Sequence, residues 1–351
     1  MFNAVTRGHA QTGSFRVGGV QPSVGVAKVQ DPHLLRVAEI ERSRRIVRAE
    51  VEFIDIPGGP EGADRSMGIG GESLSVLQRC DALALVVRAF DDPSVPHVEE
   101  AIDPYRDVAT MGLEMAFSDM AILERREERV QASMKGAKAT ERVVLLKEAG
   151  LVKHIREGLE AEVPVREQVL PADASVIIEN FRLLTAKPLF ILFNVGENDL
   201  PRLHVVDGEA RDRLARPKVD AAAMCGKLEM ELAQMAPDEE GEFRAFLGAG
   251  EPALERIVRL SYGVLDLVTF LTAAENEARA WSITQGTTAQ QAAGKIHSDL
   301  QRGFIRAEVV AFDDLIRLGS VAEARRHGLL RAEGKGYVVH EADVINFLFN
   351  V

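Results

Sequence analysis

Two short runs carry most of the information about the fold: Asp55-Ile56-Pro57-Gly58 and Asn194-Val195-Gly196-Glu197. Each comes at the end of a segment typical of a β-strand, at residues 47–56 and 189–193. Residues 82–87 are nearly all apolar, as expected for a strand covered on both faces of a parallel sheet. Strands that alternate with helical segments predict a doubly wound, mostly parallel α/β domain.

The first run has the Asp-x-x-Gly pattern of nucleotide switches. The Asp55 carboxylate can hold Mg²⁺ through water, and the Gly58 N–H can approach a γ-phosphate because no side chain blocks it. Asp before Gly at a strand end is also common turn chemistry, so this run needs support from elsewhere in the chain.

That support comes from the second run, which lies where such folds place a base-reading loop. In guanine-specific enzymes the loop reads Asn-Lys-x-Asp, and its Asp accepts hydrogen bonds from guanine. Here Glu197 replaces the Asp and Val195 replaces the Lys, so we expect weak guanine selectivity and a preference for adenine. Cys225-Gly226-Lys227 follows another apolar run and is the expected third base-contacting loop.

Two further regions interrupt or follow the α/β pattern. Residues 107–161 are rich in Glu, Lys, Arg, Ala and Leu at helical spacing, with Gly136 near the middle, and predict an inserted helical coiled-coil hairpin. Its charges mainly solvate an exposed helix pair, although the hairpin as a whole is a candidate arm for contacting a partner. The C-terminal region predicts a small α+β domain, with strands at 279–283, 304–312, 337–340 and 344–349 and helices at 289–296 and 313–326.

The chain resembles the YchF/Obg-like ATPase family along almost its whole length. The matching runs lie at residues 2–6, 21–26, 55–58, 194–197, 227–232, 279–283, 292–299, 303–309 and 333–339. The resemblance implies a P-loop NTPase-type nucleotide-binding (G-type) domain at 1–106 and 162–276, a coiled-coil insertion at 107–161, and a ubiquitin-like TGS domain at 277–351. It also implies ATP favoured over GTP, with Mg²⁺, and association with ribosomes.

Departures from the family pattern concern the phosphate site. The 351 residues contain no Gly-x-x-x-x-Gly-Lys-Ser/Thr run, so the first strand and the P-loop are expected upstream of Met1, in a longer native product. Gly19 stands where members carry a switch Thr, and it has no hydroxyl to coordinate Mg²⁺. Gly59 stands where the family has a bulky apolar residue in place of the usual catalytic Gln.

Three functions are compatible with these features. The first is an ATP- or GTP-hydrolysing switch associated with the ribosome, in which Asp55 assists Mg²⁺. The second is a pseudo-NTPase that binds the ribosome or structured RNA through its coiled coil and TGS domain without hydrolysis. The third is a structural interaction protein that binds no nucleotide.

Composition narrows the possible partners and the compartment of the protein. The formal net charge of −12 argues against a protein that coats nucleic acid through a broad basic surface, and we expect no DNA partner. No stretch is long and apolar enough to span a membrane and no signal peptide is recognisable, so the expected compartment is the cytoplasm. Cys80 and Cys225 match no metal spacing and are expected to be reduced thiols.

Overall fold

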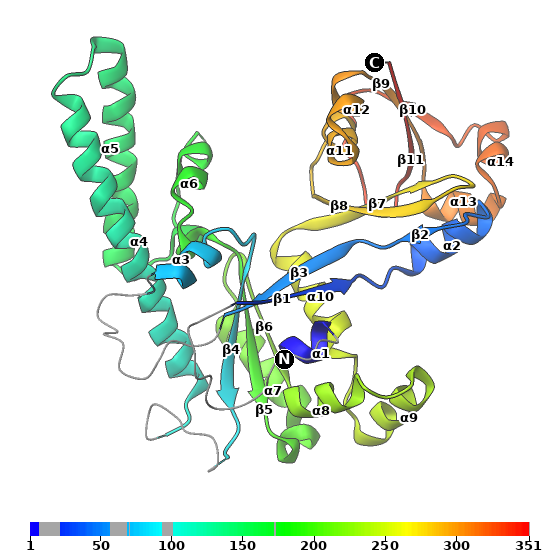
Figure 1. Cartoon of the computed structure of the whole chain (residues 1–351), viewed down its shortest axis with the longest axis horizontal. Helices are drawn as coiled ribbons and strands as arrows, with labels where there is room; N and C mark the ends of the chain where they lie inside the picture. Colours follow the sequence, from blue (N-terminus) through cyan, green and yellow to red (C-terminus); the bar gives the residue numbers. More distant parts are fainter. Residues whose placement is uncertain (7–21, 57–68, 70, 93–100, 172, 351) are drawn as a thin grey trace. The chain divides into compact units, whose positions relative to one another are not determined.

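The computed structural model describes residues 1–6, 22–56, 69, 71–92, 101–171 and 173–350 (Figure 1). The chain divides into two compact units, Met1–Val24 with Ile54–Ala253 and Gly25–Phe53 with Leu254–Val351. Within the described ranges, no helix is both long and apolar enough to cross a membrane.

The first unit is built on a parallel sheet, in which the described strands lie in the order β4 (Leu83–Ala89), β5 (Leu189–Val195) and β6 (Val219–Met224). Both faces of β5 are buried, since Ile191 and Phe193 pack into one core and Phe190 and Leu192 are also inaccessible. Burial of each such side chain stabilises the fold by roughly 1.5–3 kcal/mol. The predicted α/β class with a parallel sheet is therefore confirmed.

A helical hairpin is inserted between β4 and β5. It consists of α4 (Pro104–Met134) and α5 (Ala139–Glu160), which contact each other and extend away from the sheet (Figure 1). Asp103 starts α4, because its carboxylate accepts hydrogen bonds from the Tyr105 and Arg106 N–H groups at 3.1 Å each. The expected helical hairpin is thus found, beginning three residues before its predicted start.

Shorter helices complete the first unit. They are α1 (Phe2–Thr6), α3 (Gly71–Leu77), α6 (Ser175–Phe181), α7 (Leu203–Leu214), α8 (Gly226–Leu232) and α9 (Pro237–Leu247), with 3₁₀ turns η2 (Val165–Glu167), η3 (Leu184–Ala186) and η4 (Glu197–Arg202). α7 packs against β6 and buries Ala210 in the sheet core, and α1 contacts α8. The helical interpretation of the first residues is confirmed for Phe2–Thr6.

The second unit contains a sheet whose described strands lie in the order β10 (Arg331–Glu333), β9 (Phe304–Val310), β11 (Val344–Phe349), β7 (Leu267–Ala273), β8 (Ala278–Thr284) and β2 (Ile46–Val47). β11 is parallel to β7 and β2 is parallel to β8, whereas the other pairs are antiparallel. β1 (Ser23–Lys28) and β3 (Glu50–Asp55) form a separate pair, and the boundary between the two units falls within both strands.

Helices cover this second sheet. They are α2 (Pro32–Ile40), α10 (Ala253–Val264), α11 (Ala289–Ile296), α12 (Ser298–Arg302), α13 (Phe312–Leu318) and α14 (Val321–Arg326). Leu34 and Val37 of α2 pack with Leu271 of β7 and Leu315 of α13 in one core. A second core forms around Phe270, whose ring stacks on Trp281 at a centroid distance of 6.3 Å.

The contacts group the chain differently from the sequence-based division at residue 277. Residues 25–53 and 254–276 lie with the C-terminal part, because β2 and β7 hydrogen-bond to β8. The helix expected at 313–326 is interrupted at Gly319, which has a φ of +76°. Residues 337–340 form no regular strand, because the Tyr337 hydroxyl and the His340 N–H both donate to Asp343 and close a turn.

We predict that Tyr337→Phe lowers the free energy of unfolding by about 1 kcal/mol, because it removes the 2.7 Å hydrogen bond to Asp343. Burial, together with that hydrogen bond, raises the pKa of Tyr337 to about 12. Because this pKa exceeds that of an ordinary tyrosine, the stabilisation is complete below pH 10 and is lost as the pH rises towards 12. An ultraviolet absorbance titration should show one late-ionising tyrosine that the variant lacks. A wild type in which all three tyrosines ionise near pH 10 would contradict the prediction.

Candidate nucleotide-base site

The candidate site lies at the carboxyl edge of the parallel sheet. Asn194 is the penultimate residue of β5 and pairs in register with Met224, the last residue of β6. The loop that begins at Gly196 and the one at Cys225 therefore leave neighbouring strands at the same edge. Ligands of open α/β sheets bind at this edge, so the location suits a ligand site.

Asn194 joins the two loops. Its side-chain Oδ1 accepts a hydrogen bond from the Gly226 N–H at 2.9 Å. A Cβ atom at Gly226 would lie only 3.0 Å from the same oxygen, so a side chain there would press against Asn194. Because Oδ1 faces the Gly226 N–H, the Asn194 amide NH₂ is the group left to donate to a ligand.

Glu197 and Lys227 form a second connection between the loops. The Lys227 ammonium contacts the Glu197 carboxylate at 2.9 Å, and this hydrogen bond raises the pKa of Lys227. Both side chains are largely exposed, at 47% for Glu197 and 63% for Lys227, so the pair adds little stability. Its consequence is orientation: one Glu197 oxygen is held by Lys227, which leaves the other available as a hydrogen-bond acceptor.

Two of the predicted site residues point into the core. Val195 is 3% exposed and Cys225 is 2% exposed, and both pack in the core around Phe193. Burial raises the pKa of the Cys225 thiol, which keeps it neutral and unreactive. Only the backbone of these two residues is available to a ligand. Cys80 and Cys225 are not joined by a disulfide bond.

At Gly196, the lack of a side chain allows Phe90 to lie close to the loop that follows β5. A Cβ atom at Gly196 would lie 3.3 Å from the Cβ of Phe90, directly after β4. Phe90 is half-buried, and the Arg88 guanidinium lies over its ring at 4.8 Å from the centroid. The residue that follows β4 thus lies against the loop that follows β5.

The predicted magnesium ligand is only partly placed. Asp55 is half-buried at the end of β3, in the first unit. Gly58, Gly19 and Gly59 lie outside the described residues. The structure therefore brings together Asn194, Gly196, Glu197, Gly226 and Lys227, and shows Asp55 only as the last residue of its strand.

A buried ion pair that was not predicted from the sequence lies behind the site. Glu229 on α8 and Arg244 on α9 are 5% and 7% exposed. The Arg244 guanidinium donates to the Glu229 carboxylate at 2.9 and 2.6 Å, and Glu229 also accepts from the Ala253 N–H at 2.9 Å. This network fixes α8, which begins at Gly226. Glu229 lies within one of the family-like runs, at residues 227–232, which was the available signal.

Asp119 was missed as well. It is a fully buried carboxylate on α4 that accepts hydrogen bonds from Leu184 N–H, Thr185 N–H and the Thr185 hydroxyl, at 2.8, 2.7 and 2.7 Å. It ties the base of the hairpin to η3, immediately before β5. An acidic residue in an apolar helical stripe, between Ala116, Met120 and Leu123, was its signal in the sequence.

Known proteins resemble this chain along almost its whole length. The chain is similar to "Ribosome-binding ATPase YchF" of Bacillus subtilis (strain 168), with 36% identity over 353 residues, covering 100% of this chain and 95% of the relative. The protein of the same name in Escherichia coli O157:H7 is 34% identical over 351 residues, with the same coverage. The structure of the Schizosaccharomyces pombe YchF GTPase matches with a TM-score of 0.83 and 28% identity, covering 99% of this chain and 93% of that one. The model YchF-GTPase_C, described as a protein of unknown function (DUF933), matches residues 267–350.

Proposed function

Because this chain belongs to the YchF family, we propose that it is a nucleotide-binding switch that associates with ribosomes and hydrolyses ATP. The observation that carries the proposal is the junction of the two loops at the sheet edge, through Asn194 with Gly226 and Glu197 with Lys227. Relatives named ribosome-binding ATPases support the nucleotide and the ribosome as partners.

The polar groups of the junction favour adenine over guanine. The Asn194 NH₂ can donate to the N7 atom of a purine, and the free Glu197 oxygen can accept from the exocyclic amino group of adenine. At the same position guanine presents the O6 acceptor, which a carboxylate repels. Lys227 holds Glu197 in place, so the side chain does not have to be ordered when the base binds.

Mg²⁺ would reach this site together with the phosphates. Among the described residues, no group of three or more His, Cys, Asp or Glu could hold a metal ion. Mg²⁺ usually takes one or two carboxylates, several waters and substrate phosphates. Asp55 at the end of β3 is the proposed carboxylate, and Gly58 the proposed γ-phosphate contact. Hydrolysis would then rest on positioning and on stabilising charge on the phosphates.

A second candidate function is nucleotide binding without hydrolysis. It is favoured by Gly19, which stands at the switch position and has no hydroxyl to coordinate Mg²⁺. In this pseudo-NTPase, the hairpin and the C-terminal domain would contact the ribosome or structured RNA. Release of inorganic phosphate from ATP, measured alongside ATP binding, separates the two candidates.

We expect Glu197→Gln to reduce the preference for ATP over GTP about tenfold, because a charge-assisted hydrogen bond contributes roughly 1.5–3 kcal/mol. Isothermal titration calorimetry of the full chain with each nucleotide and Mg²⁺ gives the two dissociation constants. The matched control is Glu209→Gln, which replaces a carboxylate with a carboxamide at an exposed position on α7. An unchanged ratio of the two dissociation constants in Glu197→Gln would refute the proposed base site.

A further inference from the structure

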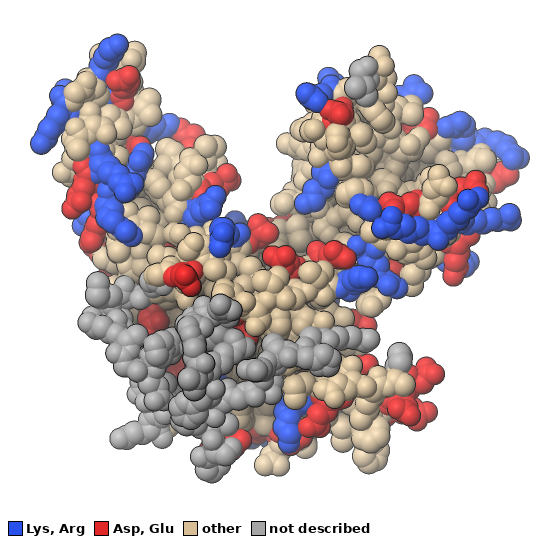
Figure 2. Space-filling view, in the orientation of Figure 1, with Lys and Arg blue, Asp and Glu red and all other residues tan. Residues whose placement is uncertain are grey.

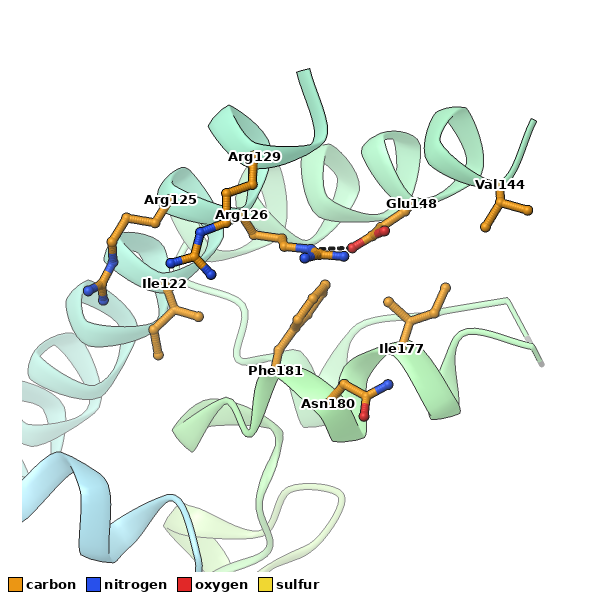
Figure 3. A pocket seen from close by; sticks show the side chains of 9 residues that line it. All are labelled: Ile122, Arg125, Arg126, Arg129, Val144, Glu148, Ile177, Asn180 and Phe181. Carbon is orange, nitrogen blue, oxygen red and sulfur yellow. Dashed lines mark hydrogen bonds and ion pairs between the residues drawn. The ribbon is translucent and has the colours of Figure 1, made fainter. Parts of the chain in front are cut away.

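A cavity of about 470 Å³ lies between the helical hairpin and α6, remote in sequence from the base-reading loops. Its walls come from α4, α5 and α6, all in the first unit (Figure 3). Arg125, Arg126 and Arg129 line it from α4, and Ile177 and Phe181 line it from α6. Figure 3 shows Phe181 and Ile177 rising from α6 towards the hairpin.

The three arginines differ in how they are engaged. Arg126 donates to the buried Glu148 at 2.5 Å, and this pair is internally neutral. Arg125 donates a hydrogen bond from its Nε to the Ala121 carbonyl at 2.9 Å. Its two terminal nitrogens do not take part in this bond. Arg129 is exposed and makes no hydrogen bond or ion pair with any residue in the described part of the chain. The cavity therefore carries uncompensated positive charge from Arg125 and Arg129.

The acidic group that lines the cavity is already paired. Glu148 is the one carboxylate among its described lining residues, and Arg126 neutralises it. On the neighbouring helix faces, Glu127 pairs with Arg156 at 2.5 Å. Figure 2 shows Lys and Arg side chains gathered on part of the hairpin. The positive charge at the cavity thus comes from arginines on one stretch of α4, although the chain as a whole has a net charge of −12.

The other wall is apolar. Ile122, Ile177 and Phe181 are partly buried around the cavity, and Val144 on α5 is 65% exposed at its end. Asn180 adds an amide that can bind a peptide backbone. A ligand that fills this cavity needs an anionic group for Arg125 and Arg129 and an apolar group for the α6 side.

We propose that this cavity binds an acidic peptide segment of a partner protein, with a carboxylate on Arg129 and Arg125 and an adjacent apolar side chain against Ile177 and Phe181. The combination of charge and apolar surface favours such a peptide over RNA. RNA binding relies on several phosphate contacts and on stacked bases. Two arginines without an acidic partner among the described residues and a mostly aliphatic wall offer few sites for either. The proposal is independent of the base site and of nucleotide hydrolysis.

The test is fluorescence anisotropy of the full chain with a fluorescein-labelled octapeptide of alternating glutamate and leucine. We expect saturable binding that Arg129→Glu weakens by about tenfold or more, because a charge-assisted contact is replaced by repulsion. Val144→Ser should weaken it about threefold through the loss of apolar contact. Arg142→Glu and Val143→Ser are matched controls, since both positions are exposed on α5 and neither lines the cavity.

Further probes separate the possible occupants. Octapeptides with lysine in place of glutamate, or serine in place of leucine, should bind at least about tenfold more weakly, because each lacks one of the two complementary groups. An octauridylate RNA should bind more weakly than the acidic peptide. No saturable peptide binding, equal losses in Arg129→Glu and Arg142→Glu, or tighter binding of the RNA would each overturn the proposal.

Discussion

Arg244→Met is expected to lower the free energy of unfolding by about 3–5 kcal/mol, because it leaves the buried Glu229 carboxylate without its counter-ion. Glu229 is 5% exposed, so water cannot replace the guanidinium. Arg244 also donates through Nε to Glu240 at 3.0 Å, and this contact is lost as well. Urea unfolding followed by circular dichroism measures the change. Trp281, the only tryptophan, lies in the second unit and would report on that unit instead.

The double variant Arg244→Met/Glu229→Leu separates the ion pair from simple packing. Removing both charges avoids an unpaired buried carboxylate, so we expect the double variant to be more stable than Arg244→Met alone. Lys153→Met is the control for an exposed pair: Lys153 contacts Glu157 at 3.7 Å on α5, and its loss should cost less than about 1 kcal/mol. If Arg244→Met and Lys153→Met destabilised the protein equally, Glu229 would not depend on Arg244.

The same pair has a consequence for the base site. α8 begins at Gly226, so the Glu229 network holds the loop that meets Asn194 and Glu197. Loss of Arg244 is therefore expected to weaken nucleotide binding without touching a residue that contacts the base. Arg244 is a positioning residue in this proposal.

The sequence predicted the helices and strands that a short stretch of residues specifies by its own pattern. The buried run at 189–193 identified β5, and helical spacing with Gly136 identified the hairpin. The pairing of β2 with β8 could not be predicted, because nothing in residues 46–47 specifies a partner strand far along the chain. Propensity identifies a strand, whereas tertiary contacts decide which sheet it joins.

The candidate site shows the same limit. Motif order placed Asn194 and Glu197 after one strand and Gly226 and Lys227 after another, and the structure joins them. The motif did not show that the Val195 side chain faces the core, because strand alternation depends on which face of the sheet is covered. The contact between Glu229 and Arg244 depends on how α9 packs on α8. That packing cannot be predicted from the sequence around either residue.

Asp119→Asn is expected to abolish a pH dependence of stability that the wild type shows between about pH 4 and pH 7. Burial raises the pKa of Asp119 from 3.8 to about 6, against the opposing effect of the hydrogen bonds from Thr185 and Leu184. A carboxyl group whose folded pKa exceeds its unfolded value stabilises the fold below pH 4 and loses that contribution as the pH rises through 6. The shift corresponds to about 3 kcal/mol in the free energy of unfolding.

The measurement is urea unfolding of the wild type and Asp119→Asn at several pH values across this range. Relative to the variant, the wild type should become less stable by up to about 3 kcal/mol as the pH increases, because burying the ionised carboxylate is unfavourable. Asp212→Asn, an exposed change on α7, controls for the loss of a surface charge. Parallel pH profiles for the wild type and Asp119→Asn would show that Asp119 remains ionised throughout. The three hydrogen bonds from Leu184 and Thr185 would then outweigh burial, and the link between the hairpin and β5 would not respond to pH in this range.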